Sequence, residues 1–253
     1  MLLFRPKGVG IIEPPRQNKK DARMGRLKTN FPPTWSMGDL LKHFGGIAPE
    51  RIRLNPPPGT ATERHVTELN DHEDKLYELV DGVLVEKVMG APESNVAAEI
   101  VRELGVFVKE RKLGVVLGAD GTLRLMPGLV RIPDVAFISV DRLPGGRIPS
   151  EAIPDLAPDL AVEVLSDGNT KQEMERKLKD YFFAGVRLVW YVNLKTRTAE
   201  VYTSPDQSVI VTEDQTLDGG DVLPGFRLRL RSVFDLLTPL PSRKANGRRK
   251  KSS

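Results

Sequence analysis

The most restrictive feature of this sequence is a stretch from Arg131 to Asn193 in which two apolar, strand-like runs each contain one acidic residue. The first run, residues 131–138, contains Asp134, and the second run, residues 158–166, contains Glu163. A charge inside a buried strand is costly unless it is paired or bound to a metal ion. Two such acids on successive strands therefore predict a polar site within the folded part of the chain.

A helix and a further strand complete this stretch. Residues 170–173 read Thr-Lys-Gln-Glu, the spacing of a capping box, so a helix is predicted from about Thr170 to Gly185. Lys177 lies on this helix, and the run 188–192 after it is nearly all apolar, as in a buried central strand. The stretch thus predicts two strand acids with a lysine behind them.

The rest of the chain shows weaker but regular signals. Asp81-Gly82 between two short apolar runs is the strongest, because this dipeptide is typical of tight β-hairpins. Apolar residues at three- and four-residue steps predict a helix over 92–112, ended by Gly114. The other predicted elements are short helices at 35–44, capped by Ser36, and at 60–70, strands at 115–117, 122–125, 198–203, 208–213 and 226–230, and a helical turn at 233–237.

The distribution of proline, glycine and charge divides the chain into four predicted segments. Residues 1–35 and 242–253 are basic arms of disordered character, residues 36–70 are a short helical extension and linker, and residues 71–241 form the folded domain. The first arm holds eight Lys and Arg against two acids and the second six against none, so the part between them carries −8 in a chain of net charge +4. Such arms either bind nucleic acid or serve as solubilising tails.

Composition excludes several classes of protein. The chain has no cysteine, which removes disulfides, zinc–thiolate sites and cysteine nucleophiles from consideration. No apolar run is long enough for a membrane span, and the N-terminus has no signal peptide, so a soluble cytoplasmic protein without a membrane partner is expected. Neither a P-loop nor a Gly-x-Ser-x-Gly motif is present.

The two acids and the lysine fit one kind of chemistry well. Hydrolysis of a phosphodiester with Mg²⁺ needs two carboxylates that converge on a hard ion, and a cation that stabilises charge developing on phosphorus. On this hypothesis Asp134 and Glu163 bind Mg²⁺, for which Mn²⁺ is able to substitute, together with the backbone carbonyl of Val164. Lys177 then orients or activates the attacking water.

Five pieces of the sequence, in the same order, resemble the Uma-two family of endonucleases, which belongs to the PD-(D/E)XK superfamily. They are YELVDG at 77–82, RIPDV at 131–135, DLAVEVLS at 159–166, KLxxYxxAGV at 177–186 and LPGF at 223–226. The similarity covers roughly residues 71–237. It implies an α/β (α+β) restriction-endonuclease-like fold, with a mixed central sheet flanked by helices, and Mg²⁺-dependent cleavage of DNA in a bacterial cell. It also implies a role for Glu78 as a further metal ligand or as a base.

Two departures from the superfamily pattern concern the site. The usual lysine lies two residues after the second acid, where this chain has Leu165, and the resemblance places the lysine on the following helix at Lys177. Many family members carry a histidine before the first long helix, where this chain reads Ser94-Asn95-Val96. The metal pair of the motif is intact, whereas the helper histidine is missing.

Each candidate residue also has an ordinary structural explanation. Asp134 after a proline is a common turn residue, Glu78 is compatible with a solvent-facing strand edge, and Lys177 with a helix pair to Glu173. Asp155 and Asp159 also follow prolines, but Asp155 is too close to Glu163 for the motif. The remaining residues considered are Lys171, Arg176 and Lys179 as alternative lysines or arginines, Tyr181 as a core residue, and His43, His65 and His72, which lack metal-ligand spacing.

The leading interpretation is a Mg²⁺-dependent endonuclease acting on DNA, with the basic arms assisting. Double-strand cleavage by one site per chain would favour a homodimer. One alternative is a nuclease-fold module that binds nucleic acid or protein without cutting, because the acidic folded part resists DNA. Another is an assembly protein whose acids form internal ion pairs.

Overall fold

The computed structural model describes residues 31–32 and 34–238, so most of the first basic arm and the whole second arm lie outside the described residues. The largest sheet has six strands. In spatial order they are β11 (Gln207–Thr212), β10 (Thr198–Ser204), β9 (Leu188–Asn193), β8 (Leu160–Leu165), β7 (Val135–Ser139) and β4 (Gly114–Leu117). Only β8 and β9 pair in parallel; the other neighbours are antiparallel. The predicted mixed central sheet is therefore confirmed.

A second, five-stranded antiparallel sheet contains the predicted hairpin. Its strands, in spatial order, are β1 (Ile52–Arg53), β3 (Val83–Lys87), β2 (Leu76–Val80), β6 (Leu129–Arg131) and β5 (Leu123–Met126). Asp81 and Gly82 form the hairpin turn with φ of 51° and 73°, the left-handed conformation that two-residue hairpin turns require. A two-stranded ribbon of β12 (Thr216–Asp218) and β13 (Arg227–Arg229) completes the strands of the described residues.

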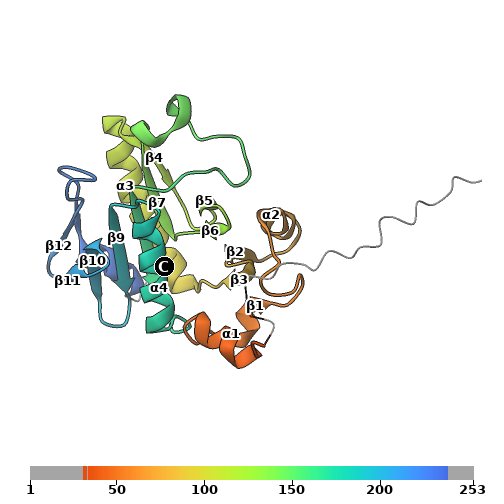
Figure 1. The fold of residues 1–253 in the computed structure, drawn as a ribbon. Coiled ribbons are helices and arrows are strands. Elements are labelled where there is room, and N and C mark those ends of the chain that lie inside the picture. The colour runs from red at the N-terminus through yellow and green to blue at the C-terminus, as the bar shows by residue number, and fades with distance from the viewer. Residues whose placement is uncertain (1–30, 33, 239–253) are drawn as a thin grey trace, which may run out of the picture.

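Helices cover both faces of the six-stranded sheet. On one face α3 (Ala91–Arg111) and α5 (Leu230–Phe234), which continues into a 3-10 turn at Asp235–Leu237, pack against Phe137, Val162 and Trp190. On the other face α4 (Lys171–Phe183) lies between the two larger sheets (Figure 1), and its Tyr181 shares a core with residues of both. None of the described helices is long and apolar enough to cross a membrane.

The run 131–138, predicted as one strand, is two strands in different sheets. The chain leaves β6 after Arg131 and enters β7 at Val135. Pro133 has no N–H for a ladder, and the Ile132 N–H donates to the Glu78 carboxylate instead of to a neighbouring strand (3.0 Å). Asp134 therefore lies at the crossing between the sheets and not in the middle of a strand.

The predicted helix boundaries need one correction. α4 begins after Thr170, whose side chain accepts from Glu173 N in the predicted capping box. The long helix α3 ends at Arg111, followed by its C-cap Lys112 in the left-handed conformation (φ 55°), and Gly114 is the first residue of β4. The close approach of Gly114 to Ile138 of β7 accounts for this glycine, since a Cβ there would lie 2.0 Å from the Ile138 carbonyl oxygen.

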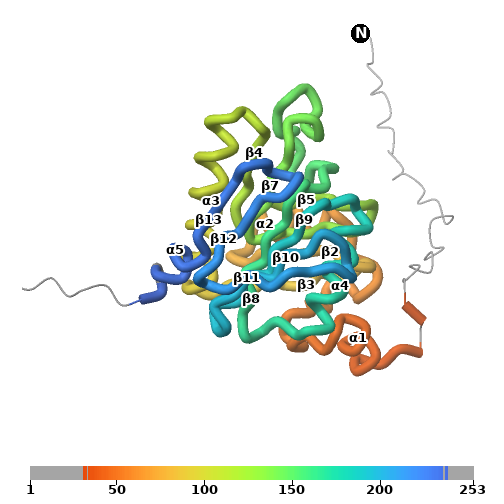
Figure 2. The backbone as a smooth tube through the Cα atoms, turned by 90° about the vertical axis from the view of Figure 1, so that its left-hand side faces the viewer, coloured from red at the N-terminus to blue at the C-terminus, as the bar shows by residue number. Residues whose placement is uncertain are grey.

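The segment before the hairpin packs closely on the rest of the protein. It contains α1 (Met37–His43), capped by Ser36 as predicted, a 3-10 turn at Pro49–Arg51, and α2 (Glu63–His72). α1 lies beside the start of α4 (Figure 2), where the Gly45 carbonyl accepts from Thr170 Oγ1 at 2.6 Å. The predicted division at residue 70 stays a prediction, although Leu40 and Phe44 already belong to the core shared by both sheets.

Candidate active site

Buried charged side chains gather where α4 meets the two larger sheets. We call them the buried charge cluster. Its members are Glu78 of β2, Lys87 of β3, Arg131 of β6, Asp134 at the sheet crossing, Glu163 of β8 and Lys177 of α4. Each of these side chains is less than a tenth exposed. The cluster contains Asp134, Glu163, Lys177 and Glu78, which are all the residues whose side chains the sequence placed in the site.

Strand register brings the two predicted metal ligands together. β7 and β8 pair antiparallel with Val135 opposite Val162, and the Asp134 N–H donates to the Val162 carbonyl at 3.0 Å. The Asp134 carboxylate accepts from the Val164 N–H at 2.7 Å, so Asp134 bonds to the backbone on both sides of Glu163. Asp134 therefore lies beside Glu163, and its charge contributes to raising the pKa of Glu163.

Asp134 is held by neighbours on both of its carboxylate oxygens. Oδ2 accepts from the backbone N–H of Val164 at 2.7 Å, and Oδ1 forms an ion pair with Lys87 Nζ at 2.9 Å. The structure thus links Val164 to the site through its amide, while a role for the Val164 carbonyl stays a prediction.

Lys177 bridges two acids of the cluster. Its ammonium lies 2.8 Å from Glu163 Oε1 and 3.1 Å from Glu78 Oε1. The Tyr181 hydroxyl, one helical turn further along α4, also donates to Glu163, so this tyrosine is both a core residue and a neighbour of the site. The surface pair with Glu173 does not form, because Glu173 instead pairs with Arg51 at 2.8 Å.

Glu78 lies inside the five-stranded sheet and not at a solvent-facing edge. Its carboxylate accepts from Ile132 N and pairs with Arg131 at 2.7 Å, and Arg131 also pairs with Asp180. Burial alone raises the pKa of Glu78, but the Lys177 and Arg131 charges outweigh this and hold the pKa well below its usual value. Glu78 is therefore a carboxylate that fixes the positions of two cations.

Glu163 has the opposite electrostatic balance. Its burial raises the pKa; Lys177 and Lys87 counteract this effect, whereas the nearby Asp134 and Glu78 charges add to it. Burial lowers the pKa of Lys177, but the two carboxylates beside it prevail and raise the pKa above its usual value. Lys177 is thus a cation at neutral pH, and another positive charge beside Glu163 would favour the charged form of this carboxylate.

Lys87 was missed in the sequence. It forms an ion pair with Asp134 and also donates to the carbonyls of Ile132 (2.6 Å) and Ala119 (3.0 Å). Its signal is the two-residue alternation of β3, in which Val83, Val85 and Lys87 share a face and the first two are buried core residues. A lysine continuing a buried face could have been recognised as a charge that needs a partner.

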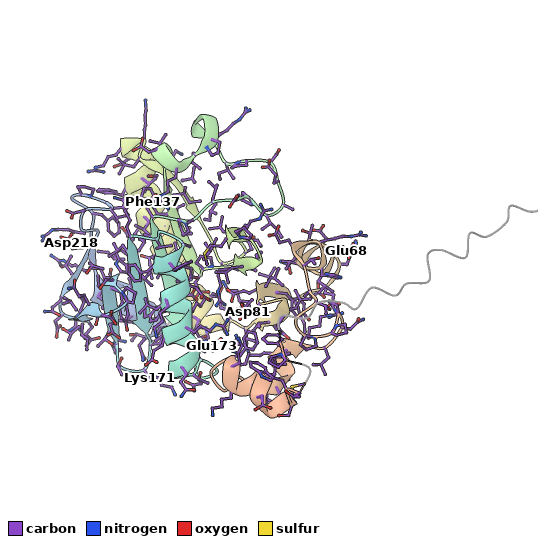
Figure 3. All side chains as sticks on the ribbon, viewed as in Figure 1. Glu68, Asp81, Phe137, Lys171, Glu173 and Asp218 are labelled. Carbon is purple, nitrogen blue, oxygen red and sulfur yellow. The ribbon has the colours of Figure 1, made fainter. Side chains whose placement is uncertain are left out.

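The competing candidates lie outside the cluster. Asp155 is exposed near Arg124, and Asp159 is buried but held by Arg142, Arg187 and the Ser139 N–H. Lys171 pairs with Glu175, Arg176 with Asp81, and Lys179 is exposed. Figure 3 shows Asp81 and Glu173 on the side where the hairpin turn and α4 approach α1. None of these competing candidates forms a hydrogen bond or ion pair with Asp134 or Glu163.

The donors of the cluster suit a hard cation that is only partly coordinated by protein. Within the described residues no group of three or more His, Cys, Asp or Glu side chains is arranged to hold a metal ion. Mg²⁺ commonly takes one or two carboxylates and completes its shell with water and substrate phosphates. The neighbouring Asp134 and Glu163 meet this minimum with oxygen donors alone, so the residues present fit Mg²⁺.

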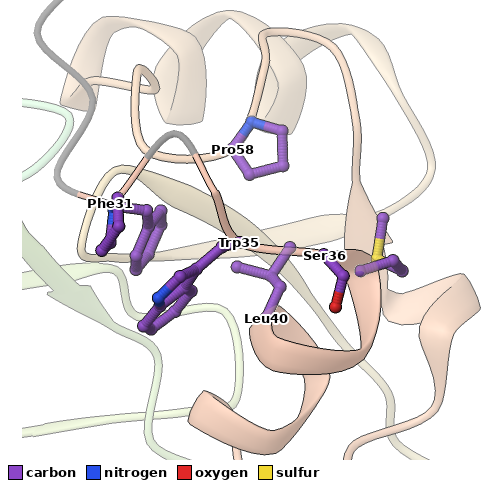
Figure 4. A pocket seen from close by; sticks show the side chains of 7 residues that line it. Phe31, Trp35, Ser36, Leu40 and Pro58 are labelled. Carbon is purple, nitrogen blue, oxygen red and sulfur yellow. The ribbon is translucent and has the colours of Figure 1, made fainter.

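Several pockets lie elsewhere on the surface of the described residues, and two of them are near α1 and beside α4. An apolar one of about 250 Å³ is lined by Phe31, Trp35, Leu40 and Pro58 near the start of the described chain (Figure 4). A larger one, about 440 Å³, runs along α4, β8, β9 and β10 and includes Tyr191, which pairs in register with Glu163. The second pocket therefore adjoins the cluster on the far side of Tyr191.

The mixed sheet with helices on both of its faces is that of a protein with the restriction-endonuclease-like fold. The chain belongs to the Uma2 family, described as "Putative restriction endonuclease", whose profile matches residues 63–231. It is similar in fold to a solved protein from Anabaena variabilis, described as "a putative nuclease belonging to DUF820", with a TM-score of 0.58 and 18% identity over 65% of this chain and 93% of that one. A search of the curated proteins found no match. The family resemblance in the sequence is thereby confirmed.

Proposed function

We propose that this protein is a Mg²⁺-dependent endonuclease that hydrolyses phosphodiester bonds in DNA, in the cytoplasm of a bacterium. The observation that carries the proposal is that Asp134 bonds to the backbone of Val162 and Val164 on either side of Glu163, while Lys177 forms an ion pair with Glu163. Membership of the nuclease family supports the reaction class.

In this proposal each residue of the cluster has a distinct task. Asp134 and Glu163 hold the ion, with the carbonyl of Val164 as a further donor. The bound ion would lower the pKa of a water molecule and neutralise charge on the phosphate. Lys177 donates hydrogen bonds to the attacking water or to a phosphate oxygen, as one oriented cation in a water-poor site.

Other residues position Lys177. Glu78 shares its ammonium with Glu163, and Arg131 fixes Glu78 in turn. Tyr181 limits the rotation of Glu163 through its hydrogen bond. Held in this way, Lys177 on the helix can supply the positive charge that the superfamily motif usually has at the position of Leu165 in β8.

The DNA is expected to be bound in part by the basic arms. The folded part between the arms is acidic, so the arms supply the positive charge that a polyanion needs. With one active site per chain, a homodimer would have two sites, one for each strand of the DNA.

The direct test is nicking of supercoiled plasmid with Mg²⁺, with Mn²⁺ and with chelator. The wild-type protein should nick only with a divalent ion, and Asp134→Asn and Glu163→Gln should each remove the activity while keeping the far-ultraviolet circular dichroism of the wild type. Near-wild-type cleavage by either variant would refute the metal-pair assignment.

A second function is favoured by one specific observation. Each acid of the metal pair already has a lysine as its counter-charge, Asp134 with Lys87 and Glu163 with Lys177, without a metal ion. A nuclease-fold module that binds nucleic acid or protein without cutting has this property. Binding of DNA that persists in chelator, together with no nicking under any divalent ion, would select this function.

A further inference from the structure

We propose that the Lys87 ammonium occupies a cation position on Asp134 and thereby lowers the affinity of the site for divalent ions. The inference rests on the proposed function, because it concerns the same pair of acids. Lys87, a residue outside the family motif, thus controls how tightly the ion binds.

The surroundings of the Lys87 ammonium are those of a bound cation. An ammonium has three N–H donors. Here three oxygens lie within hydrogen-bond distance: Asp134 Oδ1 at 2.9 Å, the Ile132 carbonyl at 2.6 Å and the Ala119 carbonyl at 3.0 Å. One carboxylate and two carbonyls are also the kinds of oxygen that hard metal ions take as ligands.

The fold builds this position from three separate segments. Lys87 ends β3 of the five-stranded sheet, Ile132 and Asp134 flank Pro133 at the crossing between sheets, and Ala119 follows β4. The Lys87 and Asp134 side chains are 7% and 6% exposed, so water screens their interaction poorly. The ion pair is therefore a fixed part of the interior.

The charge balance distinguishes Lys87 from Lys177. Lys177 has two carboxylate partners, Glu78 and Glu163, so it keeps one of them if an ion engages the other. Asp134 is the single carboxylate bound to Lys87 among the described residues. A divalent ion on Asp134 must therefore compete with Lys87 for the same negative charge, and the two cations repel each other.

The experiment compares Mn²⁺ binding by the full-length wild type, Lys87→Met and Lys87→Gln. Binding is followed by the rise in melting temperature during a Mn²⁺ titration, and free Mn²⁺ by electron paramagnetic resonance. The Mn²⁺ concentration at half-saturation should be at least roughly tenfold lower for both variants than for the wild type, because a fixed positive charge beside the ion is gone. The glutamine retains an N–H donor for Asp134 and provides a second variant if the methionine variant does not fold.

The matched control is Lys75→Met. Lys75 lies at the start of the same hairpin and pairs with Glu86 at 2.7 Å, but its side chain is 52% exposed. The Lys75→Met variant loses one positive charge on the surface of the same sheet, and it should bind Mn²⁺ like the wild type. Adding Asp134→Asn to Lys87→Met should abolish the gain.

Each outcome separates this inference from the proposed function. Unchanged Mn²⁺ affinity in both Lys87 variants, or an equal gain in Lys75→Met, would overturn the inference and leave the nuclease proposal standing. Tighter Mn²⁺ binding by the Lys87 variants, combined with a wild type that nicks no plasmid under any ion, would support the inference and reject the nuclease function.

Discussion

At the scale of single residues, Lys177 is the most informative position for mutation. Replacing it with methionine leaves Glu78 and Glu163 buried without their shared cation, so the free energy of unfolding should fall by about 3–5 kcal/mol. Under the nuclease proposal turnover should fall roughly 100-fold or more, through loss of one oriented charge. Urea denaturation and plasmid nicking at a temperature where the variant is folded measure the two effects separately.

Lys179→Met is the control for this variant. Lys179 lies on the same helix but is exposed, so its replacement should change stability by no more than about 0.5 kcal/mol. Equal nicking rates in Lys177→Met and Lys179→Met would assign Lys177 a purely structural role.

A second residue-scale prediction concerns acid. Because the folded-state pKa of Glu78 lies below its unfolded value of about 4.3, the ionised form stabilises the fold, and this stabilisation is lost as pH falls below that value. The difference in unfolding free energy between wild type and Glu78→Gln should therefore shrink from pH 6 to pH 3. Urea denaturation at each pH measures it.

Glu163→Gln provides the contrast for the acid series. Burial raises the folded-state pKa of Glu163, so its ionised form costs stability that is regained as pH falls through the folded pKa. Relative to Glu163→Gln, the wild type should gain stability on acidification. Parallel curves for both variants would contradict the opposite shifts of the two acids.

The site was predicted from sequence as far as single residues allow. Acids in apolar runs need partners wherever they lie, which is why Asp134 and Glu163 were identified locally. Lys87, the partner of Asp134, and Arg131, the partner of Glu78, were missed because the residues of each pair are far apart in the sequence, and no local spacing records such contacts. The roles of all these residues in catalysis remain predictions.

At the scale of elements, the contact between α1 and α4 depends on one glycine. Gly45 has φ of 78°, and a Cβ there would lie 2.5 Å from Glu173 N, so Gly45→Ala combines backbone strain with a backbone clash. We expect it to lower the free energy of unfolding by about 2–4 kcal/mol. Chemical denaturation checks this value.

Gly46→Ala is the adjacent control. Gly46 has φ of 74°, but nothing lies within 4 Å of the added Cβ, so only the conformational cost of about 1 kcal/mol applies. If both variants lost the same stability, the close packing of α1 on α4 would not contribute to folding.

Local signals account for most of the elements that were predicted. The hairpin was found because Asp81-Gly82 suits its turn, and α4 because its capping box lies within four residues. The division into two sheets was not found, because residues 131–138 read as one mostly apolar strand in the sequence, whereas their two strands belong to different sheets. The two-residue β1 also depends on a distant partner, β3.

At the scale of the whole molecule, the charge of the arms is open to a direct test. Deleting residues 1–30 and 242–253 removes fourteen Lys and Arg while keeping Phe31 and Trp35, whose rings stack at 5.0 Å. DNA binding should weaken, and the slope of log affinity against log salt should become shallower because fewer counterions are released. Fluorescence anisotropy across a salt series measures the slope, and an unchanged slope would show that the arms do not contact DNA.

The sheet crossing at Ile132-Pro133-Asp134 also has a consequence for biosynthesis. Glu163 and Asp134 belong with the six-stranded sheet, whereas Lys87, Glu78 and Arg131 come from the five-stranded one. A newly made chain in which only one sheet has formed would lack either Asp134 and Glu163 or the pair of Glu78 and Arg131 that positions Lys177. If the protein cuts DNA, cleavage would then begin only after both sheets have docked, and a half-folded chain would be harmless to the genome of the cell that makes it.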